Sequence, residues 1–343
     1  MKAPHIQLLS VVAMGTVWCL IGGCQPNSEP TSPGSSATAG AESAAPGTAS
    51  SKTLAVCSFN IQFLGSSARR DNAALAELLK PYDIVVVQEL IAAPAEGPND
   101  QPESRQRAAA FFKEMATRGF QYVLSESDTG RNGPLNNYST ATEWWVTFYK
   151  PASIAPVTDI PHGFISAPLA KNPDYDRVPY AFAFRTPDHH CDFVLISVHL
   201  NPDDAGRRAH ELNAIGGWVA GEEAQQAEKD FVILGDMNIQ NPGELQADTP
   251  ANFISLNQAC VPTNVNPSSP KPYDHVMFDP RFTTEIDRNY GFKVVNLIEA
   301  MRPYWHQAEP YPGDPFQQNT FRFYYSDHDP VVFHIQVPDA DDD

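Results

Sequence analysis

Residues 231–238 read FVILGDMN, a run of apolar residues that ends in a glycine, an aspartate and an asparagine. An apolar run of this length followed at once by polar residues is typical of a buried β-strand whose end reaches solvent. Similar runs occupy residues 84–89 (IVVVQE) and 193–201 (FVLISVHLN), and residues 53–62 (TLAVCSFNIQ) have a β-type composition. Because strand ends are rigid, several of them at one edge can hold acid, amide and imidazole groups in a fixed geometry.

Helical patterns and further β-type runs separate these strands. Between Thr53 and Val337 there is no internal repeat and no change of composition. Many strands with few helices therefore predict one α/β domain, residues 52–337, with two packed sheets and helices outside them. The other expected strands cover residues 143–149, 181–185 and 331–337, and the expected helices run from an Asp71 cap to Pro81 and over residues 104–118 and 205–224.

The charge balance limits the ways in which the protein can bind nucleic acid. The 343 residues include 23 Lys and Arg against 41 Asp and Glu, which gives a formal net charge of −18. This argues against a basic arm or stripe that holds nucleic acid by electrostatic attraction alone. It leaves open a phosphodiesterase, because a divalent cation supplies local positive charge inside an acidic site. After residue 24 no apolar run is long enough to span a bilayer.

The first 51 residues indicate export and an anchor rather than a folded unit. A weakly basic start, the apolar stretch 6–21 and the small residues before Cys24 form a secretory signal. Its end resembles a bacterial lipobox, which implies that residues 1–24 are a lipoprotein signal and that Cys24 is lipidated. The alternatives are an ordinary signal peptide with an unrelated cysteine, or a membrane helix. Residues 25–51, rich in Pro, Ser and Ala, predict a flexible tether, and residues 338–343 an acidic tail.

The expected location is therefore the bacterial cell envelope. A lipid on Cys24 would hold the protein on a membrane, facing the periplasm or the exterior. The choice between inner and outer membrane stays open.

Six short runs carry residues that bind metals or transfer protons. Each has an ordinary structural explanation when taken alone, such as a turn, a surface histidine or an acid that re-enters solvent. Six of them in one chain, each next to an apolar run, favour a shared site. In chain order they read SFNIQ (58–62), VVVQE (85–89), SVHLN (197–201), GDMN (235–238), YDH (273–275) and SDHDPV (326–331).

In order and spacing this set resembles the endonuclease/exonuclease/phosphatase superfamily, whose namesake nuclease is deoxyribonuclease I. The resemblance covers nearly everything from Thr53 to Val337. It implies a four-layer α/β sandwich, with the active site at one end of two packed mixed sheets. It also implies a Mg²⁺ (or Mn²⁺) site held by Glu89 together with Asn60 and Asp327, since hard oxygen ligands suit these cations.

The resemblance assigns further residues to the phosphate and to proton transfer. Asp236 and Asn238 would position the attacking water and the scissile phosphate. His328, oriented by Asp274, would act on the nucleophile or on a phosphoryl oxygen. A carboxylate bound to one ring nitrogen fixes the tautomer and raises the basicity of the other nitrogen, so such pairs suit acid–base chemistry.

A second imidazole and an arginine complete the implied site. His199 would lie on the other side of the phosphate, with Glu143 as its expected partner, and Arg177 would contact phosphate. Judged on the residues alone, three assignments keep an alternative. The alternative role of Asn60 is that of a turn residue. Glu143 is alternatively a charged surface residue, and Arg177 the partner of an acid in a salt bridge.

The predicted function follows from what phosphodiester hydrolysis requires. A phosphodiester repels anionic nucleophiles, so the reaction needs a cation, a group that positions water and stabilisation of the leaving oxygen. We therefore expect a Mg²⁺-dependent phosphodiesterase whose substrate is DNA, that is, an endonuclease. One alternative is a phospholipid or inositol-phosphate phosphodiesterase or phosphatase on the same fold. The other is a non-catalytic surface binding protein, against which the intact set of residues argues.

The sequence differs from deoxyribonuclease I at positions that contact the substrate, more than at positions implied to carry out hydrolysis. Leu90-Ile91 stand where that nuclease has an arginine that reaches into the minor groove. Residues 130–132 resemble its GRN loop, but the loop here is longer, so Tyr138 cannot be given the role of its tyrosine. Its two disulfides are absent, and an odd number of cysteines leaves at least one free thiol or an intermolecular bond. The cysteines that remain after processing are Cys57, Cys191 and Cys260.

Overall fold

The computed structural model describes residues 52–95, 102–129, 143–168 and 172–341. The predicted signal peptide, the lipid anchor at Cys24, the tether and the GRN segment lie outside these residues. Within the described residues, no helix is both long and apolar enough to cross a membrane.

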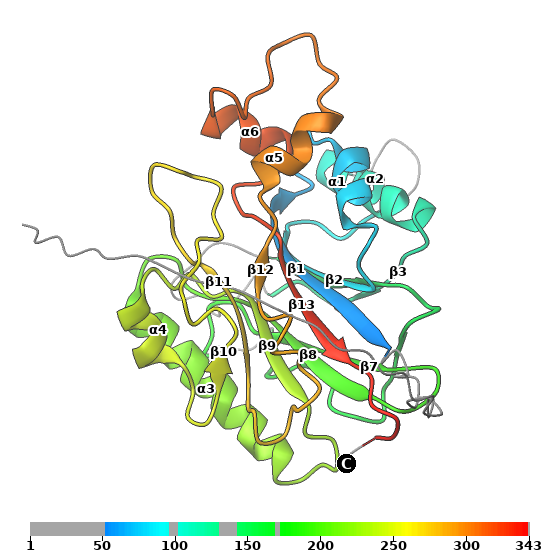
Figure 1. Ribbon diagram of the computed structural model, residues 1–343, viewed down its shortest axis with the longest axis vertical. Helices are drawn as coiled ribbons and strands as arrows, with labels where there is room; N and C mark the ends of the chain where they lie inside the picture. Colours follow the sequence, from blue (N-terminus) through cyan, green and yellow to red (C-terminus); the bar gives the residue numbers. More distant parts are fainter. Residues whose placement is uncertain (1–51, 96–101, 130–142, 169–171, 342–343) are drawn as a thin grey trace, which may run out of the picture. The chain divides into compact units, whose positions relative to one another are not determined.

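One mixed sheet carries the first two of the six runs (Figure 1). Its strands lie in the order β12-β13-β1-β2-β4-β3, in which β1 and β2 are parallel and the other neighbours are antiparallel. The valines of the run 84–89 are fully buried, as a strand that is apolar on both faces predicts. The strands are β1 (Thr53–Leu64), β2 (Ile84–Leu90), β3 (Gln121–Leu124), β4 (Trp144–Tyr149), β12 (Lys293–Val294) and β13 (Val331–Gln336).

The second mixed sheet carries the next three runs. Its strands lie in the order β10-β11-β9-β8-β7-β5, with β6 paired to β7 as well. Only β8 and β9 are parallel among the neighbours of this sheet in the described chain. The strands are β5 (Ala155–Pro156), β6 (Gly163–Phe164), β7 (Tyr180–Arg185), β8 (Asp192–His199), β9 (Phe231–Asp236), β10 (Ile254–Ser255) and β11 (Asp274–Phe278).

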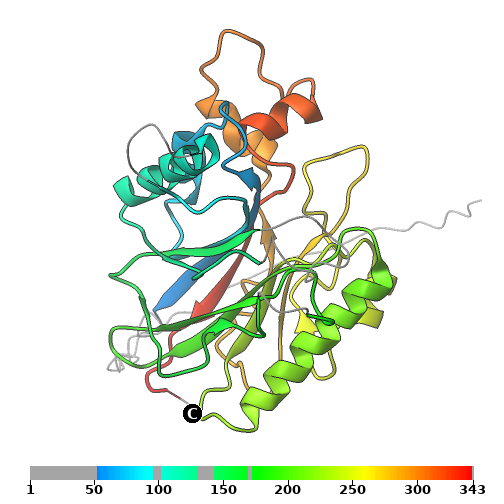
Figure 2. The ribbon, with the colours of Figure 1, turned by 180° about the vertical axis from the view of Figure 1, so that it is seen from behind.

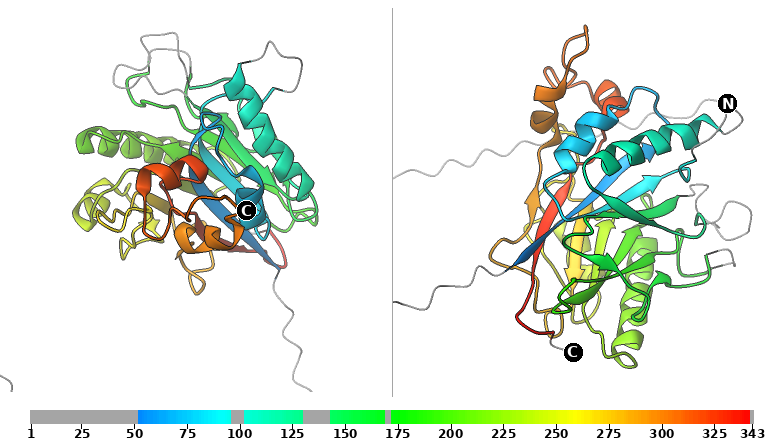
Figure 3. Two further views of the ribbon diagram at one scale, coloured as in Figure 1. Left: turned by 90° about the horizontal axis from the view of Figure 1, so that it is seen from above. Right: turned by 90° about the vertical axis from the view of Figure 1, so that its right-hand side faces the viewer.

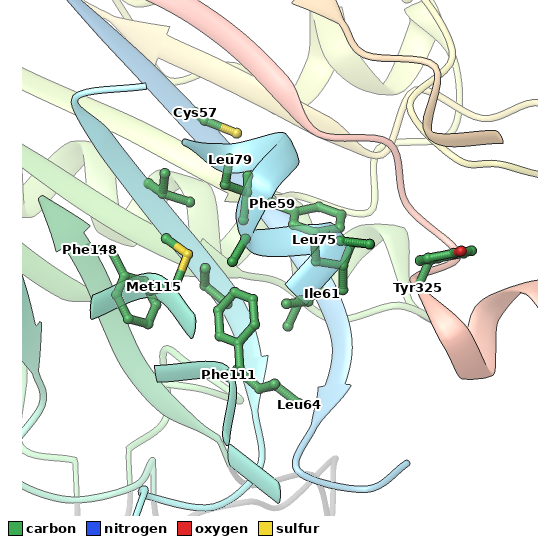
Figure 4. Close-up of a cluster of buried hydrophobic side chains, with 14 of the residues drawn as sticks. Cys57, Phe59, Ile61, Leu64, Leu75, Leu79, Phe111, Met115, Phe148 and Tyr325 are labelled. Carbon is green, nitrogen blue, oxygen red and sulfur yellow. The ribbon is translucent and has the colours of Figure 1, made fainter. Parts of the chain in front are cut away.

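Three apolar clusters separate four layers. The first lies between the first sheet and the helices α1 and α2, and Figure 4 shows Phe59 packed there with Leu75 and Phe111. The second fills the space between the two sheets. The third lies between the second sheet and α3, which runs along the outer face of that sheet in Figure 2. Seen from above in Figure 3, α2 and α3 lie on opposite outer faces, so the predicted four-layer sandwich is confirmed.

The predicted helices are present, but three short ones were not predicted. Asp71 caps α1 by accepting a hydrogen bond from the backbone N–H of Ala74. The unpredicted helices α4, α5 and α6 have five to seven residues, too few for a periodic apolar pattern to stand out. The helices are α1 (Asn72–Leu79), α2 (Glu103–Thr117), α3 (Ala205–Glu223), α4 (Pro242–Asp248), α5 (Leu297–Met301), the 3₁₀ turn η1 (Arg302–Tyr304) and α6 (Gln318–Tyr324).

Helix α3 continues through Gly216 and Gly217, where the sequence predicted a weak point. A Cβ atom on Gly216 would lie 2.7 Å from Cβ of Pro250, so the glycine permits close packing of the segment after α4. The three cysteines of the described chain are all free, and Cys57 is buried as an apolar residue.

Candidate active site

Polar strand ends from both sheets meet at one end of the sandwich. Asn60 lies in β1 of the first sheet, and Asp236 ends β9 of the second. The side-chain amide of Asn60 donates hydrogen bonds to Glu89 Oε1 and to Asp236 Oδ2, each at 2.9 Å. One amide therefore joins the acidic strand ends of the two sheets.

Three neighbouring strands of the second sheet present a row of polar side chains. In the strand register, Asp236 lies opposite His199 of β8 on one side and opposite Asp274 of β11 on the other. Residues directly opposite point to the same face of a sheet, so one imidazole and two carboxylates share a face. Gly235 has φ +136°, and a Cβ there would lie 2.2 Å from the carbonyl oxygen of Val198. The glycine of GDMN is thus required by the close approach of β8 and β9.

The segment before β13 brings His328 to this row. His328 Nδ1 lies 2.9 Å from Asp274 Oδ2, and its Nε2 lies 3.5 Å from Asp236 Oδ2. The hydroxyl of Thr263 also donates to Asp274 Oδ2, at 2.6 Å. The predicted contact between His328 and Asp274 is present, and their chemical roles stay predictions.

Glu143, the residue before β4, holds the second imidazole. His199 Nδ1 and Arg177 Nε each lie 3.1 Å from Glu143 Oε1. Glu143 Oε2 accepts the backbone N–H of Glu89 at 2.6 Å, and His199 Nε2 lies 3.6 Å from Asp236 Oδ2. Glu143 is therefore a buried partner of His199, as predicted, and not a surface charge. Arg177 is buried in an ion pair with Glu143, and its contact with phosphate stays a prediction.

The charges of the site favour protonated imidazoles. Burial and the charge of Arg177 lower the pKa of His199, but Glu143 and Asp236 outweigh them, and the pKa lies above its ordinary value. For His328, burial is outweighed by Asp274 and Asp236, which hold its pKa well above the ordinary value. Burial opposes the charge of Asp236, yet the two imidazoles beside it lower its pKa. The arrangement is therefore a carboxylate between two proton-bearing rings.

The acidic groups fit a divalent cation. Ligand atoms of Glu89, His199 and Asp236 lie within 4.8 Å of one another. Because a protonated imidazole cannot bind a cation, the two carboxylates are the ligands that this group offers. Asp327 Oδ2 accepts from Gln62 Nε2 at 2.6 Å, whereas Asp327 Oδ1 is buried and has no hydrogen-bond partner among the described residues. Burial raises the pKa of Glu89, and the charge of Asp327 adds to this effect. A buried carboxylate oxygen without a donor is the kind of ligand that hard cations take.

The two asparagines of the predicted site act as hydrogen-bond donors. The side-chain oxygen of Asn60 accepts from the backbone N–H of Gln62 at 2.9 Å, so its NH₂ group faces the carboxylates. The backbone N–H of Asn238 donates to Asp236 Oδ1 at 3.0 Å, and its side chain donates to the carbonyl of Leu200 at 3.0 Å. Both residues fix the Asp236 carboxylate, while metal binding by Asn60 and phosphate binding by Asn238 stay predictions.

Four non-glycine residues of the site have left-handed backbone conformations. Their φ angles are +51° at Gln62, +50° at Phe63, +64° at Glu89 and +51° at Asn238. Each such residue costs on the order of 1–3 kcal/mol, and strain of this kind concentrates at functional sites. In this left-handed conformation the backbone N–H of Phe63 donates a hydrogen bond to Glu89 Oε2 at 2.9 Å.

The sequence did not identify three supporting residues. Gln62 and Ser326 lie inside the quoted runs, so their proximity to the motifs was an available signal. Ser326 Oγ donates to the carbonyl of Asn60 at 2.7 Å and accepts the backbone N–H of His328 at 3.1 Å. Thr263, which binds Asp274, lies in a loop with no pattern that could have indicated it.

Comparisons with known proteins agree with the fold described above. The sequence profile of the Endonuclease/Exonuclease/phosphatase family matches residues 57–328. A search of curated proteins gives no match. Among solved structures, an endonuclease/exonuclease/phosphatase family protein from Bacteroides thetaiotaomicron has a TM-score of 0.53 at 14% identity, over 83% of this chain and 95% of that chain.

Two further solved structures share the fold. TDP2 of D. rerio, complexed with a single strand DNA product, has a TM-score of 0.50 at 12% identity, over 82% of this chain and 98% of that chain. The mannosyl-6-phosphatase of Bacteroides thetaiotaomicron VPI-5482 has a TM-score of 0.52 at 14% identity, over 82% of this chain and 98% of that chain. At these identities the likeness establishes the fold alone.

Proposed function

Because the chain belongs to the Endonuclease/Exonuclease/phosphatase family, whose members are phosphoesterase hydrolases, we propose that it is a Mg²⁺-dependent phosphodiesterase that cuts DNA. The observation that carries the proposal is the convergence of two imidazoles on one carboxylate. His199 Nε2 and His328 Nε2 lie 3.6 Å and 3.5 Å from the same oxygen of Asp236. The other ring nitrogen of each imidazole contacts a second carboxylate, Glu143 for His199 and Asp274 for His328. Groups that can donate and accept protons therefore surround one oxygen of Asp236.

The residues of the site divide the reaction between them. The oxygen of a water bonds to phosphorus while the bond from phosphorus to the leaving oxygen breaks. Asp236, fixed by Asn60 and Asn238, takes the proton of the water. His328 donates a hydrogen bond to a phosphoryl oxygen, and His199 gives a proton to the leaving oxygen. A divalent cation at Glu89 and Asp327 would supply positive charge against the phosphate.

DNA is the proposed substrate for two reasons. The order of the motifs resembles that of deoxyribonuclease I, and TDP2 of D. rerio, which shares the fold, was solved with a single strand DNA product. With a net charge of −18, binding would depend on the site itself and not on a basic surface.

Nicking of supercoiled plasmid by the purified protein tests the proposal. We expect nicking in Mg²⁺, none in excess EDTA, and none from His328→Ala. The matched control is His210→Ala, because His210 lies on the outer helix α3 and forms an exposed pair with Asp174. Turnover of sphingomyelin, an inositol phosphate or mannose 6-phosphate without nicking would move the function to the phospholipid or sugar phosphate class. Inactivity on every substrate would favour a binding protein.

We further propose that the protein is lipid-anchored at Cys24 in the bacterial cell envelope. The small residues before Cys24 and the tether composition of residues 25–51 support this. A flexible chain of that length extends roughly 30 Å, enough to separate the folded part from the bilayer surface. Cys24→Ala should leave the precursor uncleaved and without acyl chains. A mature protein with a free Cys24 thiol, or with another N-terminus in mass spectrometry, would refute the anchor.

A further inference from the structure

We propose that Arg70 is a positioning residue, which holds the end of β1 so that Gln62 and Phe63 orient the carboxylates of Asp327 and Glu89. The inference rests on the proposed divalent cation site. Arg70 lies in the loop between β1 and α1, outside all six sequence runs.

The guanidinium of Arg70 binds backbone carbonyls and no acid. Its side chain is buried, with 9% of the residue exposed. Nη1 donates to the carbonyl of Ile61 at 2.6 Å and also to the carbonyl of Tyr325, and Nη2 donates to the carbonyl of Gln62. In the described chain it forms no ion pair with a carboxylate. Three carbonyls from two distant segments therefore converge on one planar cation, which has the several donors that such an arrangement needs.

The segment that Arg70 holds is strained, and it contacts both acids. Gln62 and Phe63 are consecutive left-handed residues. The side chain of Gln62 donates to Asp327 Oδ2 at 2.6 Å, and the backbone N–H of Phe63 donates to Glu89 Oε2 at 2.9 Å. Relaxation of this turn would move both donors together, because two neighbouring backbone conformations would change.

The hydrogen bond from Arg70 to the carbonyl of Tyr325 holds the second segment, which leads to His328. The next residue, Ser326, binds the carbonyl of Asn60 and the backbone N–H of His328. The side chains of Ile61 and Tyr325 belong to one buried apolar cluster, which Figure 4 shows. Apolar packing thus fixes these two side chains, while Arg70 fixes their carbonyls.

Arg70 also places a positive charge near the two acids without using their oxygens. Burial lowers the pKa of Arg70 to about 10, and Glu89 and Asp327 act against that shift. The guanidinium is therefore charged at neutral pH. Because it bonds only to carbonyls, the oxygens of Glu89 and Asp327 keep their capacity to bind a cation.

Binding of Mn²⁺ to the metal-free mature protein, measured by calorimetry, tests the inference. Arg70→Lys keeps the charge but cannot span three carbonyls, and we expect roughly 10- to 100-fold weaker binding, as for other partners that orient metal ligands. The matched control is Arg118→Lys. Arg118 is partly buried and donates to the carbonyls of Ala73 and Glu114, as Arg70 does to other carbonyls, but it also forms ion pairs with Glu77 and Glu114 and caps α2 away from the site. It should lose similar stability and no Mn²⁺ affinity.

A second variant keeps the test decisive if Arg70→Lys does not fold. Gln62→Leu removes the donor to Asp327 and should also weaken Mn²⁺ binding, and the double variant should be scarcely weaker than either single variant. Unchanged Mn²⁺ affinity in Gln62→Leu, or in folded Arg70→Lys, would overturn the inference. So would a wild-type protein that binds no Mn²⁺. A wild-type protein that binds Mn²⁺ but hydrolyses no phosphodiester would refute the proposed function and leave the role of Arg70 intact.

Discussion

Replacing Asp274 with asparagine tests whether the charge of this carboxylate, rather than its hydrogen bonds, supports turnover. Asp274 Oδ2 accepts from His328 Nδ1 at 2.9 Å and from Thr263 Oγ1 at 2.6 Å. An amide oxygen at the same place can accept both bonds, so Asp274→Asn removes the charge and keeps the shape. Two unit charges about 4 Å apart interact by about 4 kcal/mol at an effective dielectric constant of about 20. Because this attraction keeps the His328 ring protonated, its loss disfavours the protonated ring, the proposed donor to the phosphoryl oxygen, by about 10³-fold, and the rate should fall accordingly.

The assay is steady-state hydrolysis of bis-p-nitrophenyl phosphate in saturating Mg²⁺, with a melting curve for each variant. We expect kcat to fall about a thousandfold in Asp274→Asn and at least about a hundredfold in His328→Ala, with little change in Tm. The double variant should be scarcely worse than either single variant, because the two residues act as one unit. Asp174→Asn is the control, since Asp174 forms a contact of 3.0 Å with an exposed histidine, His210. Penalties that multiply in the double variant would show independent action, and near-wild-type turnover of His328→Ala would remove the pair from the mechanism.

Three further perturbations test the metal site, the sheet pairing and a buried acid. Glu89→Gln keeps the side-chain shape and should abolish most turnover with an unchanged circular dichroism spectrum, whereas full activity in this variant would refute a metal role for Glu89. Gly235→Ala should cost roughly 3 kcal/mol or more in urea unfolding, because the added Cβ would lie 2.2 Å from a carbonyl oxygen, and a loss below 1 kcal/mol would contradict that geometry. Burial raises the pKa of Glu211 to about 7, so the folded state binds its proton more tightly than the unfolded chain does. This contribution to stability is complete below about pH 4 and is lost as the pH rises through 7, by about 3 kcal/mol in total. Relative to wild type, Glu211→Gln should therefore gain stability between pH 5 and pH 8, and equal slopes for the two proteins would contradict this.

The apolar pattern was sufficient to predict the long strands and helices. Both faces of the run 84–87 are buried, and Asp71 caps α1, because burial and capping act over a few neighbouring residues. Strand pairing does not follow from such local patterns. Asp236 has His199 and Asp274 as its strand neighbours, and these lie 37 and 38 positions away in the chain. Their meeting depends on which strands pair, a choice that is made by the whole sheet.

The candidate site was predictable where a chemical group ends a strand, and less so where its partner comes from a loop. Glu143 directly precedes β4, and the family resemblance implied its pairing with His199. For Arg177 the sequence left two interpretations open, a contact with phosphate or a salt bridge, because its position after a loop sets no direction for the side chain. The structure shows a salt bridge with Glu143. Thr263 had no signal at all, since a lone threonine in a loop matches no pattern until the fold brings it to Asp274.

The position of Asp236 between the two sheets explains why the site needs the whole sandwich. Its Oδ2 takes a hydrogen bond from Asn60 of the first sheet and faces His199 of the second. Neither sheet alone contains both groups, so the geometry around this oxygen depends on the apolar cluster that fixes the distance between the sheets. Because packed interiors tolerate changes of even one methylene poorly, that distance is set tightly. The six runs are spread over the chain for this reason, since each sheet contributes strand ends that become a site only after the sheets have packed.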